Sequence, residues 1–506
     1  MPKTIIDLLK AADPNMSALS GTNRPDLTFG GLLSQAETTV AALNERGIGR
    51  NDRIAIVLPN GPEMASAFVS GGAGATTAPL NPAYREEEFD FYLSDLNAKA
   101  LMVEHGSTSP ALAVAKARDI PVLEIGWNES EPAGAFSIQG EALGDPVAHG
   151  GFAESDDGAL VLHTSGTTSR PKIVPLTQTN VCASAGNIAA TLRLTSADRC
   201  LNVMPLFHIH GLIAAVLSSL SAGASIFCTP GFNALNFFAM LEEAKPSWYT
   251  AVPTMHQTIL TRAARNQEIV DQANLRFARS SSSSLPPQVM LELEKVFGCP
   301  VIEAYGMTEA SHQMASNPLP EAPRKPGSVG IAAGPEVAIM KQDGSAILAQ
   351  GDTGEIVIRG ENVFKGYERN PTANAEAFTD GWFRTGDQGT MDGEGYITIT
   401  GRLKEIINRG GEKISPREVD DILMDHPAIQ QVVTFAMPHD KLGEEVAAAI
   451  VLREGEETDE KAIREFASGR LADFKVPRKV LILDEIPKGA TGKLQRIGLA
   501  EKLGLA

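Results

Sequence analysis

A loop of small residues, hydroxyls and two cations follows an apolar run in the first third of the chain. Residues 162–172 read Leu-His-Thr-Ser-Gly-Thr-Thr-Ser-Arg-Pro-Lys. The apolar residues 158–162 predict a buried strand, and residues 177–194 have the spacing of a helix. Backbone amides and hydroxyls in such a loop can surround a phosphate, and its Arg and Lys supply positive charge. The loop is not a Walker loop, because the G-x-x-x-x-G-K-[ST] pattern is absent. Hydroxyl-rich loops are more often plain turns, so a phosphate role needs support from elsewhere in the chain.

Six further runs are too polar and too rich in glycine to be core, yet they stand at the ends of predicted strands. Ligands of open α/β sheets bind at the carboxyl ends of the parallel strands, so these runs are candidate parts of one site. They are residues 205–211, 279–284, 303–309, 381–387, 401–414 and 487–496.

The elements that would position these runs alternate between helical and strand patterns. Residues 29–103 and 201–304 predict two α/β units with parallel sheets and crossover helices, joined by an exposed connection at 130–157. Short β-like runs between glycine-rich turns predict an antiparallel element at 327–400. A helix that begins at Pro416 opens a small α+β unit. The expected fold class is α/β: residues 1–403 form a large domain of two doubly wound subdomains plus a small β element, and residues 404–506 form a small α+β domain.

Composition limits the function classes. The 506 residues carry a net charge of −18 with no compensating basic block, which argues against nucleic-acid binding. No apolar run is long enough to span a bilayer, and the first residues lack the pattern of a signal peptide, so we expect a cytoplasmic protein without membrane contact. The four cysteines are scattered without a C-x-x-C pair, which indicates neither a zinc site nor a disulfide framework.

Taken together and in this order, the seven runs resemble those of the adenylate-forming superfamily, which includes acyl-CoA synthetases, peptide-synthetase adenylation domains and luciferases. The resemblance covers nearly the whole chain. Within the superfamily, the chain most resembles the oxalate–CoA ligases. That resemblance rests on the Ser-Arg pair of the loop and on residues 249–254, 307–312, 316–320 and 408–416. It implies ATP, Mg²⁺ and CoA as cofactors and co-substrates: a carboxylate attacks the α-phosphorus of ATP, and a thiol then attacks the acyl-adenylate.

The resemblance also implies a nucleotide site. The residues that would hold the phosphates are Thr164, Ser165, Gly166, Thr167, Thr168 and Lys172. Glu309 would hold Mg²⁺ together with Thr168. Asp387 would accept both ribose hydroxyls, which an ionised carboxylate can do with its two oxygens, and Arg402 would face the ribose or the phosphates. The rest of the nucleotide would be framed by Ser282, Ser283, Glu303, Ala304, Tyr305 and Thr308.

Catalysis and domain motion are implied in the same way. Lys493 falls at the family's adenylation lysine, where it would bridge the α-phosphate and the attacking carboxylate; the plainer interpretation is an exposed surface charge. Thr168 and Glu309 would assist it. Lys404 falls at the hinge about which the C-terminal domain rotates. Gly410, Gly411 and Lys413 would contribute to the CoA channel.

The identity of the acid depends on a different set of side chains. Amino-acid-activating domains carry an Asp in a Phe-Asp pair, whereas residues 205–208 read Pro-Leu-Phe-His, which disfavours an α-amino acid. Long fatty acids need an apolar tunnel, but the candidate pocket residues are imidazoles and hydroxyls: His208, His210, Ser281, Ser282 and His312. A small dicarboxylate carries a second charge that must be paired when it is buried, and His and Ser donors can pair it. His312 could instead be a half-buried histidine bonded to backbone, and His208 could be a gate that acts whatever the acid.

Oxalate is therefore the favoured substrate, and the chain is expected to act as a monomer or homodimer. Three alternatives stay open: a CoA ligase for malonate or a benzoate-like acid, a stand-alone adenylation enzyme that loads a carrier protein, and an inactive adenylate-binding regulator. One departure bears on the last of these. Ile173 stands where the superfamily usually has Gly, and a β-branched residue would be strained there if the position requires a positive φ.

Overall fold

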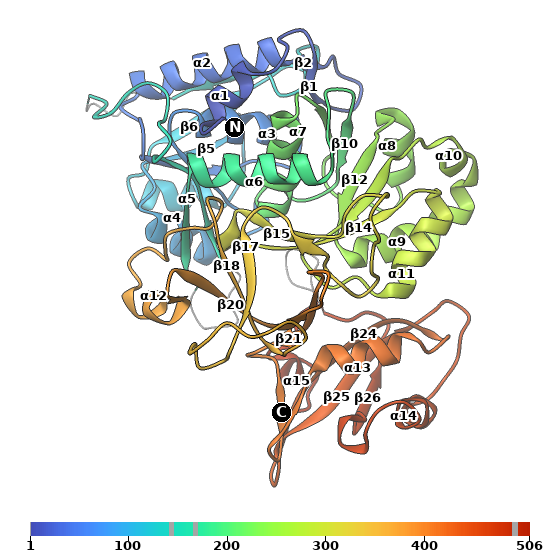
Figure 1. Cartoon of the computed structure of the whole chain (residues 1–506). Coiled ribbons are helices and arrows are strands. Elements are labelled where there is room, and N and C mark those ends of the chain that lie inside the picture. Colours follow the sequence, from blue (N-terminus) through green and yellow to red (C-terminus); the bar gives the residue numbers. More distant parts are fainter. Residues whose placement is uncertain (1, 141–145, 165–170, 488–493) are drawn as a thin grey trace.

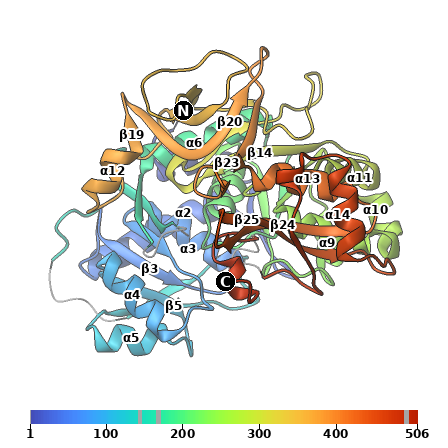
Figure 2. The ribbon, with the colours of Figure 1, turned by 90° about the horizontal axis from the view of Figure 1, so that it is seen from below.

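The computed structural model describes residues 2–140, 146–164, 171–487 and 494–506. Two large sheets and a small antiparallel sheet make up most of the molecule, and the C-terminal hundred residues lie below them in Figure 1. Figure 2, the view from below, has the C-terminal strands in front of the rest. The expected α/β class, with a large N-terminal part and a small C-terminal part, is confirmed. The domain boundary at 403/404 stays a prediction.

The first large sheet has seven strands in the order β7-β6-β5-β3-β4-β8-β9, and the inner five are parallel. Successive side chains of a strand point to opposite faces of the sheet, and both faces of this sheet are buried. In β3, Ile54 and Ile56 therefore pack in one apolar cluster, and Ala55 and Val57 pack in another. The strands are β3 (Arg53–Val57), β4 (Thr76–Pro79), β5 (Ala100–Glu104), β6 (Val122–Gly126), β7 (Ser137–Gln139), β8 (Gly158–His163) and β9 (Ile173–Thr177). The helices packed against it are α2 (Phe29–Glu45), α3 (Pro62–Gly72), α4 (Glu86–Leu96), α5 (Ala111–Ala117) and α6 (Gln178–Thr191).

The second large sheet has nine strands in the order β16-β15-β14-β13-β12-β10-β11-β1-β2. The run from β14 to β1 is parallel. Its strands are β1 (Ser17–Ser20), β2 (Leu27–Thr28), β10 (Arg199–Asn202), β11 (Ser225–Cys228), β12 (Trp248–Ala251), β13 (Phe277–Ser280), β14 (Val301–Met307), β15 (His312–Ser316) and β16 (Ile331–Ala332). One face is covered by α8 (Phe237–Ala244), α9 (Pro253–Ala263), α10 (Gln267–Gln272) and α11 (Pro287–Phe297). The other face meets the first subdomain through helix α1 (Ile5–Lys10), the π-helix η1 (His210–Leu217) and α7 (Ser218–Ser221).

The predicted antiparallel element is present as a five-stranded sheet. Its elements are β17 (Glu336–Met340), β18 (Gly354–Arg359), α12 (Pro371–Ala377), β19 (Phe378–Thr379), β20 (Trp382–Met391) and β21 (Ile397–Arg402). A turn at 403–406 leads to the C-terminal sheet, which has its own apolar clusters on both faces. That last part contains β22 (Ile407–Arg409), β23 (Glu412–Ile414), α13 (Pro416–Met424), β24 (Ile429–His439), β25 (Gly443–Leu452), α14 (Glu460–Ser468), β26 (Lys479–Ile482) and α15 (Leu499–Lys502).

Two local features differ from the sequence-based expectation. The hydroxyl-rich loop leads into strand β9 rather than directly into a helix, so it is the loop of an antiparallel β8–β9 hairpin. Strand β9 contains Pro175, which is tolerated because β9 is the edge strand of its sheet. The apolar residues after His210 form a π-helix, a form found mostly near functional sites.

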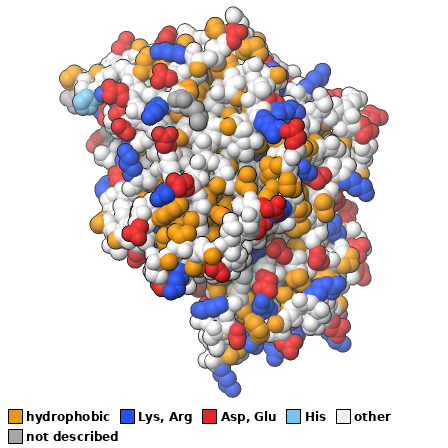
Figure 3. All heavy atoms as spheres, viewed as in Figure 1, with side chains coloured by type: hydrophobic (Ala, Val, Ile, Leu, Met, Phe, Trp, Pro, Cys, Tyr) orange, Lys and Arg blue, Asp and Glu red, His pale blue; other side chains and the backbone are white. Residues whose placement is uncertain are grey.

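The surface in Figure 3 has acidic and basic side chains interspersed over the face it displays. Among the helices of the described residues, none combines the length and the apolar character needed to cross a membrane.

Candidate active site

Strand β8 ends at the hydroxyl-rich loop, and two described residues form the base of that loop. The backbone amide of Thr164 donates to the carbonyl of Lys172 at 2.9 Å, and the amide of Lys172 donates to Thr164 Oγ1 at 3.1 Å. Ser165, Gly166, Thr167 and Thr168, which are predicted to hold phosphate, lie outside the described residues. So does Lys493, the predicted catalytic lysine.

Ile173 is accommodated without strain. It begins strand β9, it is not among the residues with positive φ, and it is 4% exposed within the apolar cluster on that face of the sheet. The position therefore has no need of glycine for its backbone conformation. The expected strain of a β-branched residue at this position is therefore absent, and Ile173 gives no support to the alternative of an inactive adenylate-binding regulator.

Glu309 lies next to the base of this loop. It sits in a 3₁₀ turn, η3 (Thr308–Ala310), which follows strand β14, and is 6% exposed. Its Oε1 accepts a hydrogen bond from the Tyr367 hydroxyl at 2.8 Å, and Lys172 Nζ lies 4.3 Å from the centroid of the Tyr367 ring. Burial raises the pKa of Glu309, while the Tyr367 hydrogen bond and the charge of Lys172 act in the opposite direction. The ends of two different sheets thus bring a carboxylate and a lysine together.

The Glu309 carboxylate has the surroundings of a Mg²⁺ ligand, and not those of a metal ion that is bound by protein side chains alone. Within the described part of the chain, no group of three or more His, Cys, Asp or Glu side chains could hold a metal ion. Mg²⁺ is usually held by one or two carboxylates together with water and substrate phosphates. A single buried carboxylate beside a phosphate-type loop fits that pattern.

Asp387 is held by donors from two elements. Its Oδ2 accepts from the Tyr305 hydroxyl at the end of β14, and its Oδ1 accepts from Arg402 Nε at 2.9 Å, across the β20–β21 pairing. Asp387 is buried, whereas the Arg402 side chain is 47% exposed. The Asp387 charge raises the pKa of Arg402, and burial together with that charge raises the pKa of Tyr305. A carboxylate fixed in this way retains lone pairs for further donors.

The predicted nucleotide-framing residues line the ends of β13 and β14. The Ser281 hydroxyl donates to the Ala304 carbonyl at 2.8 Å, which joins the two strand ends. Glu303 Oε1 accepts from the Leu285 amide at 2.9 Å, and burial raises the pKa of Glu303 to about 7. Ser283 is exposed at the start of the following loop.

Two of the three predicted pocket histidines meet in a buried polar cluster. The His210 and His312 rings are 5.0 Å apart between centroids. His210 Nδ1 lies 3.0 Å from Ser282 Oγ, and His210 Nε2 lies 2.7 Å from Thr250 Oγ1. Ser282, Ser311 and His312 have φ of 75°, 50° and 101°, a backbone strain that is typical of functional sites. His208 is half-buried in the turn that precedes η1.

Arg279 belongs to the same cluster; it opens the candidate run 279–284, but the sequence analysis gave it no role of its own. Its side chain is 0% exposed; Nη1 lies 3.5 Å from His210 Nε2, and Nη2 donates to Gln313 Oε1 at 3.4 Å. Among the described residues, none of the ion pairs to a carboxylate involves Arg279. The sequence marks Arg279 only as the first residue of a polar run, and its complete burial follows from the fold.

Two family models match most of the chain. The model for AMP-binding enzymes matches residues 10–368, and the model for their C-terminal domain matches residues 418–493. The chain belongs to the AMP-binding enzyme family.

Known members of the family resemble the chain over nearly its full length. A protein of Arabidopsis thaliana named oxalate–CoA ligase is 46% identical over 491 residues, which are 96% of this chain and 95% of that protein. A protein of Saccharomyces cerevisiae with the same name is 44% identical over 476 residues, 89% of this chain and 87% of that protein. The crystal structure of ATP-bound MatB from Rhodopseudomonas palustris superposes with a TM-score of 0.89 at 28% identity, with 99% of each chain covered.

The remaining predicted residues of this AMP-binding enzyme lie in the C-terminal part. Lys404 is exposed in the turn between β21 and β22. Gly410 and Gly411 form the β22–β23 turn with φ of 59° and 103°, and Lys413 is exposed on β23. The two glycines are required by that backbone conformation.

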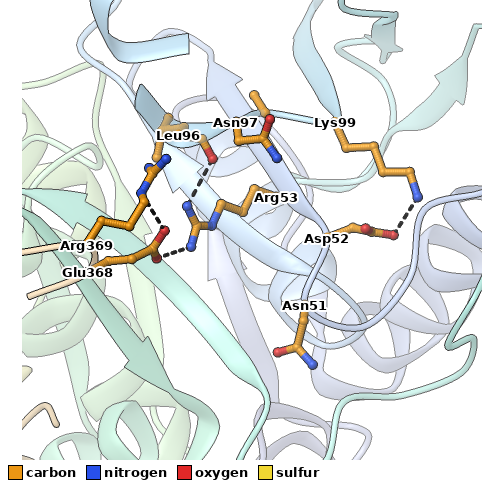
Figure 4. A pocket seen from close by; sticks show the side chains of 9 residues that line it. Asn51, Asp52, Arg53, Leu96, Asn97, Lys99, Glu368 and Arg369 are labelled. Carbon is orange, nitrogen blue, oxygen red and sulfur yellow. Dashed lines mark hydrogen bonds and ion pairs between the residues drawn. The ribbon is translucent and has the colours of Figure 1, made fainter. Parts of the chain in front are cut away.

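A surface pocket of about 460 Å³ is lined by a different set of residues (Figure 4). Its lining includes Asn51, Asp52 and Arg53 at the amino end of β3, where Arg53 pairs with Glu368. Glu368 also lines this pocket, and its backbone amide donates to the carbonyl of Ile173, the residue after Lys172. None of the predicted site residues lines it.

Proposed function

We propose that this AMP-binding enzyme is an ATP-dependent oxalate–CoA ligase. In the first half-reaction an oxalate oxygen attacks the α-phosphorus of ATP, and the bond to pyrophosphate breaks to give oxalyl-AMP. In the second, the CoA sulfur attacks the oxalyl carbonyl, AMP leaves, and the thiol proton is released. The products are oxalyl-CoA, AMP and pyrophosphate.

The nucleotide would lie across the ends of the two large sheets. Residues 164–172 hold its phosphates in this proposal, and Asp387 accepts from its ribose. Glu309 would hold Mg²⁺, which would supply positive charge to the phosphates. Lys493 stabilises the charge that develops between the carboxylate and the α-phosphate.

Two half-reactions with different nucleophiles call for two arrangements of the chain. We propose residues 1–403 and 404–506 as two domains that rotate about Lys404. This rotation would replace Lys493 at the site by the loop of Gly410 and Gly411. The support is that the turn at 403–406 separates two sheets with separate apolar cores.

One observation carries the choice of oxalate. A chain similar over 96% of its length to a ligase named for oxalate has two buried imidazoles, His210 and His312, and the half-buried hydroxyl of Ser282 where a fatty-acid ligase needs an apolar tunnel. A small doubly charged acid is the ligand that such donors can pair.

The test is pyrophosphate release from ATP and Mg²⁺ with oxalate, malonate, benzoate and acetate, each with and without CoA. The proposal expects the highest kcat/KM with oxalate and sustained turnover only when CoA is present. A higher kcat/KM with any other acid would refute the substrate, and sustained turnover without CoA would refute the ligase reaction.

A further inference from the structure

We propose that Arg279 pairs with the second carboxylate of the acid and thereby selects doubly charged small acids over singly charged ones. The inference rests on the proposed function and assigns its specificity to a residue of strand β13. Arg279 would then contact the carboxylate that does not react, opposite the one that attacks ATP.

The first support is the burial of a charge without a counter-charge. Arginine is almost never fully buried unless it is paired, because desolvation of the guanidinium is costly. Arg279 is 0% exposed, and its Nε has no hydrogen-bond partner among the described atoms. Burial lowers the pKa of Arg279 to about 9, so the side chain still carries its charge near neutral pH. Such a group is stabilised when an anion enters.

The position on the sheet makes the charge more unusual. Thr250 and Ile302 are the register partners of Arg279 on the neighbouring strands, and Phe277 shares its face two residues earlier. Phe277 and Ile302 belong to the main apolar core. An apolar side chain would therefore be the expected occupant of this position if packing alone decided it.

Among the residues that the structure describes, the groups near Arg279 offer hydrogen bonds but no carboxylate. Nη1 lies 3.5 Å from His210 Nε2, and Nη2 lies 3.4 Å from Gln313 Oε1. The hydroxyl of Ser311, fully buried beside His312, has no hydrogen-bond partner among the described atoms. Cys200 also faces Arg279, but burial raises the pKa of its thiol well above the usual value, so it remains neutral and is no counter-ion. A guanidinium among imidazoles and hydroxyls has the chemistry of a carboxylate site.

The cluster is also connected to the proposed nucleotide site. His210 contacts Arg279 through Nε2 and Ser282 through Nδ1 at 3.0 Å. Ser282 lies two residues after the end of β13, in the run predicted to frame the nucleotide. His210 thus joins the guanidinium to the run that is predicted to frame the nucleotide, and the proposal directs the reacting carboxylate of the acid towards that run.

The experiment compares oxalate with oxamate, in which one carboxylate is replaced by a neutral amide of nearly the same shape. Binding is measured by calorimetry with the unreactive analogue α,β-methylene-ATP present, so that no turnover is needed. The proteins are the wild type, Arg279→Met, Arg279→Lys and the control Arg193→Met, which removes an exposed arginine paired with Glu321.

We expect Arg279→Met to weaken oxalate binding by about 100-fold, as the loss of a charge-assisted pair implies, and to change oxamate binding less than about threefold. Arg279→Lys keeps the positive charge but cannot form the bidentate hydrogen bonds of a guanidinium, so it should bind oxalate more tightly than Arg279→Met and more weakly than the wild type. The control should match the wild type. Equal oxalate affinity in Arg279→Met and the wild type would overturn the proposal.

Thermal unfolding separates this role from a structural one. Since the unliganded protein buries an unpaired charge, Arg279→Met should melt no lower than the wild type, yet lose the stabilisation that oxalate gives. A variant that melts well below the wild type and loses both acids alike would assign Arg279 to the core and overturn the proposal. If the wild type prefers malonate to oxalate and Arg279→Met abolishes that preference, the proposed substrate fails but the role of Arg279 holds. If the wild type binds no doubly charged acid better than oxamate, the proposal is refuted.

Discussion

Replacement of Asp387 by Asn should weaken ATP use by an amount that the hydrogen bonds around this residue determine. A carboxylate has about four acceptor positions, and Tyr305 and Arg402 occupy two of them, which leaves two for the ribose hydroxyls. In Asp387→Asn the single amide oxygen faces Arg402, and the amide NH₂ donates to the Tyr305 oxygen. One ribose hydroxyl then loses its acceptor. A hydrogen bond to a charged group contributes about 1.5–3 kcal/mol, so kcat/KM for ATP should fall roughly 10- to 150-fold.

The assay is ATP–pyrophosphate exchange with oxalate, run with ATP, 2′-deoxy-ATP and 3′-deoxy-ATP. Both deoxy analogues should be poor substrates of the wild type. In Asp387→Asn one of them should react nearly as fast as ATP, because the hydroxyl it lacks has no acceptor in the variant. Asp392→Asn, which removes an exposed partner of Lys325 on the following turn, is the matched control and should leave these rates unchanged. Equal penalties for both analogues in Asp387→Asn and the wild type would refute the ribose role.

Three further variants test other parts of the site. Glu303→Gln removes a group whose pKa burial raises to about 7. Between the ordinary glutamate pKa and this value the folded wild type keeps a proton that the unfolded chain has lost, so its stability falls as the pH rises over that range. The variant's advantage in free energy of unfolding should therefore grow by about 2.5 kcal/mol between pH 5 and pH 8. A pH-independent difference in denaturant unfolding would contradict this. Ile173→Gly should lower the free energy of unfolding by about 3–5 kcal/mol, because Ile173 is buried in a strand and has an ordinary φ. The variant should not catalyse ATP–pyrophosphate exchange faster than the wild type. Faster exchange would mean that Ile173 impairs the phosphate loop. Tyr367→Phe removes the hydroxyl that donates to Glu309, and it should raise the Mg²⁺ concentration that gives half the maximal rate about tenfold. The same Mg²⁺ concentration in the variant and the wild type would argue against Glu309 as the metal ligand.

The order of helices and strands, and the polar segments at the ends of strands, could be predicted from the sequence because both depend on residues that are neighbours in the chain. Apolar periodicity predicts the alternation of helices and strands in the two α/β units, and the polar runs 279–284 and 303–309 mark the ends of strands β13 and β14. Strand β9 was missed because a five-residue run with a central proline resembles a loop unless its edge position is known. The pairing of β1 with β11 was also inaccessible, since it joins segments two hundred residues apart.

The candidate site likewise has residues that the sequence identified and contacts that only the fold determines. The residue types of the polar runs, together with the resemblance to the adenylate-forming superfamily, were sufficient to select His210, His312 and Asp387. They did not reveal that Tyr305 and Arg402 hold Asp387 from two different sheets, because that depends on strand register and on how the sheets pack. Arg279 was missed because the absence of a counter-charge is a property of the folded environment, and only the structure displays it.

The most direct test of oxalyl-AMP formation follows one oxygen atom. The protein is incubated with ATP, Mg²⁺, CoA and oxalate that carries ¹⁸O in its carboxylates, and the products are analysed by mass spectrometry. Attack of a carboxylate oxygen on the α-phosphorus, followed by thiolysis, leaves that oxygen on the phosphate. We predict equimolar oxalyl-CoA, AMP and pyrophosphate, with one ¹⁸O in each AMP. Unlabelled AMP, or ADP and phosphate in place of AMP and pyrophosphate, would contradict the account.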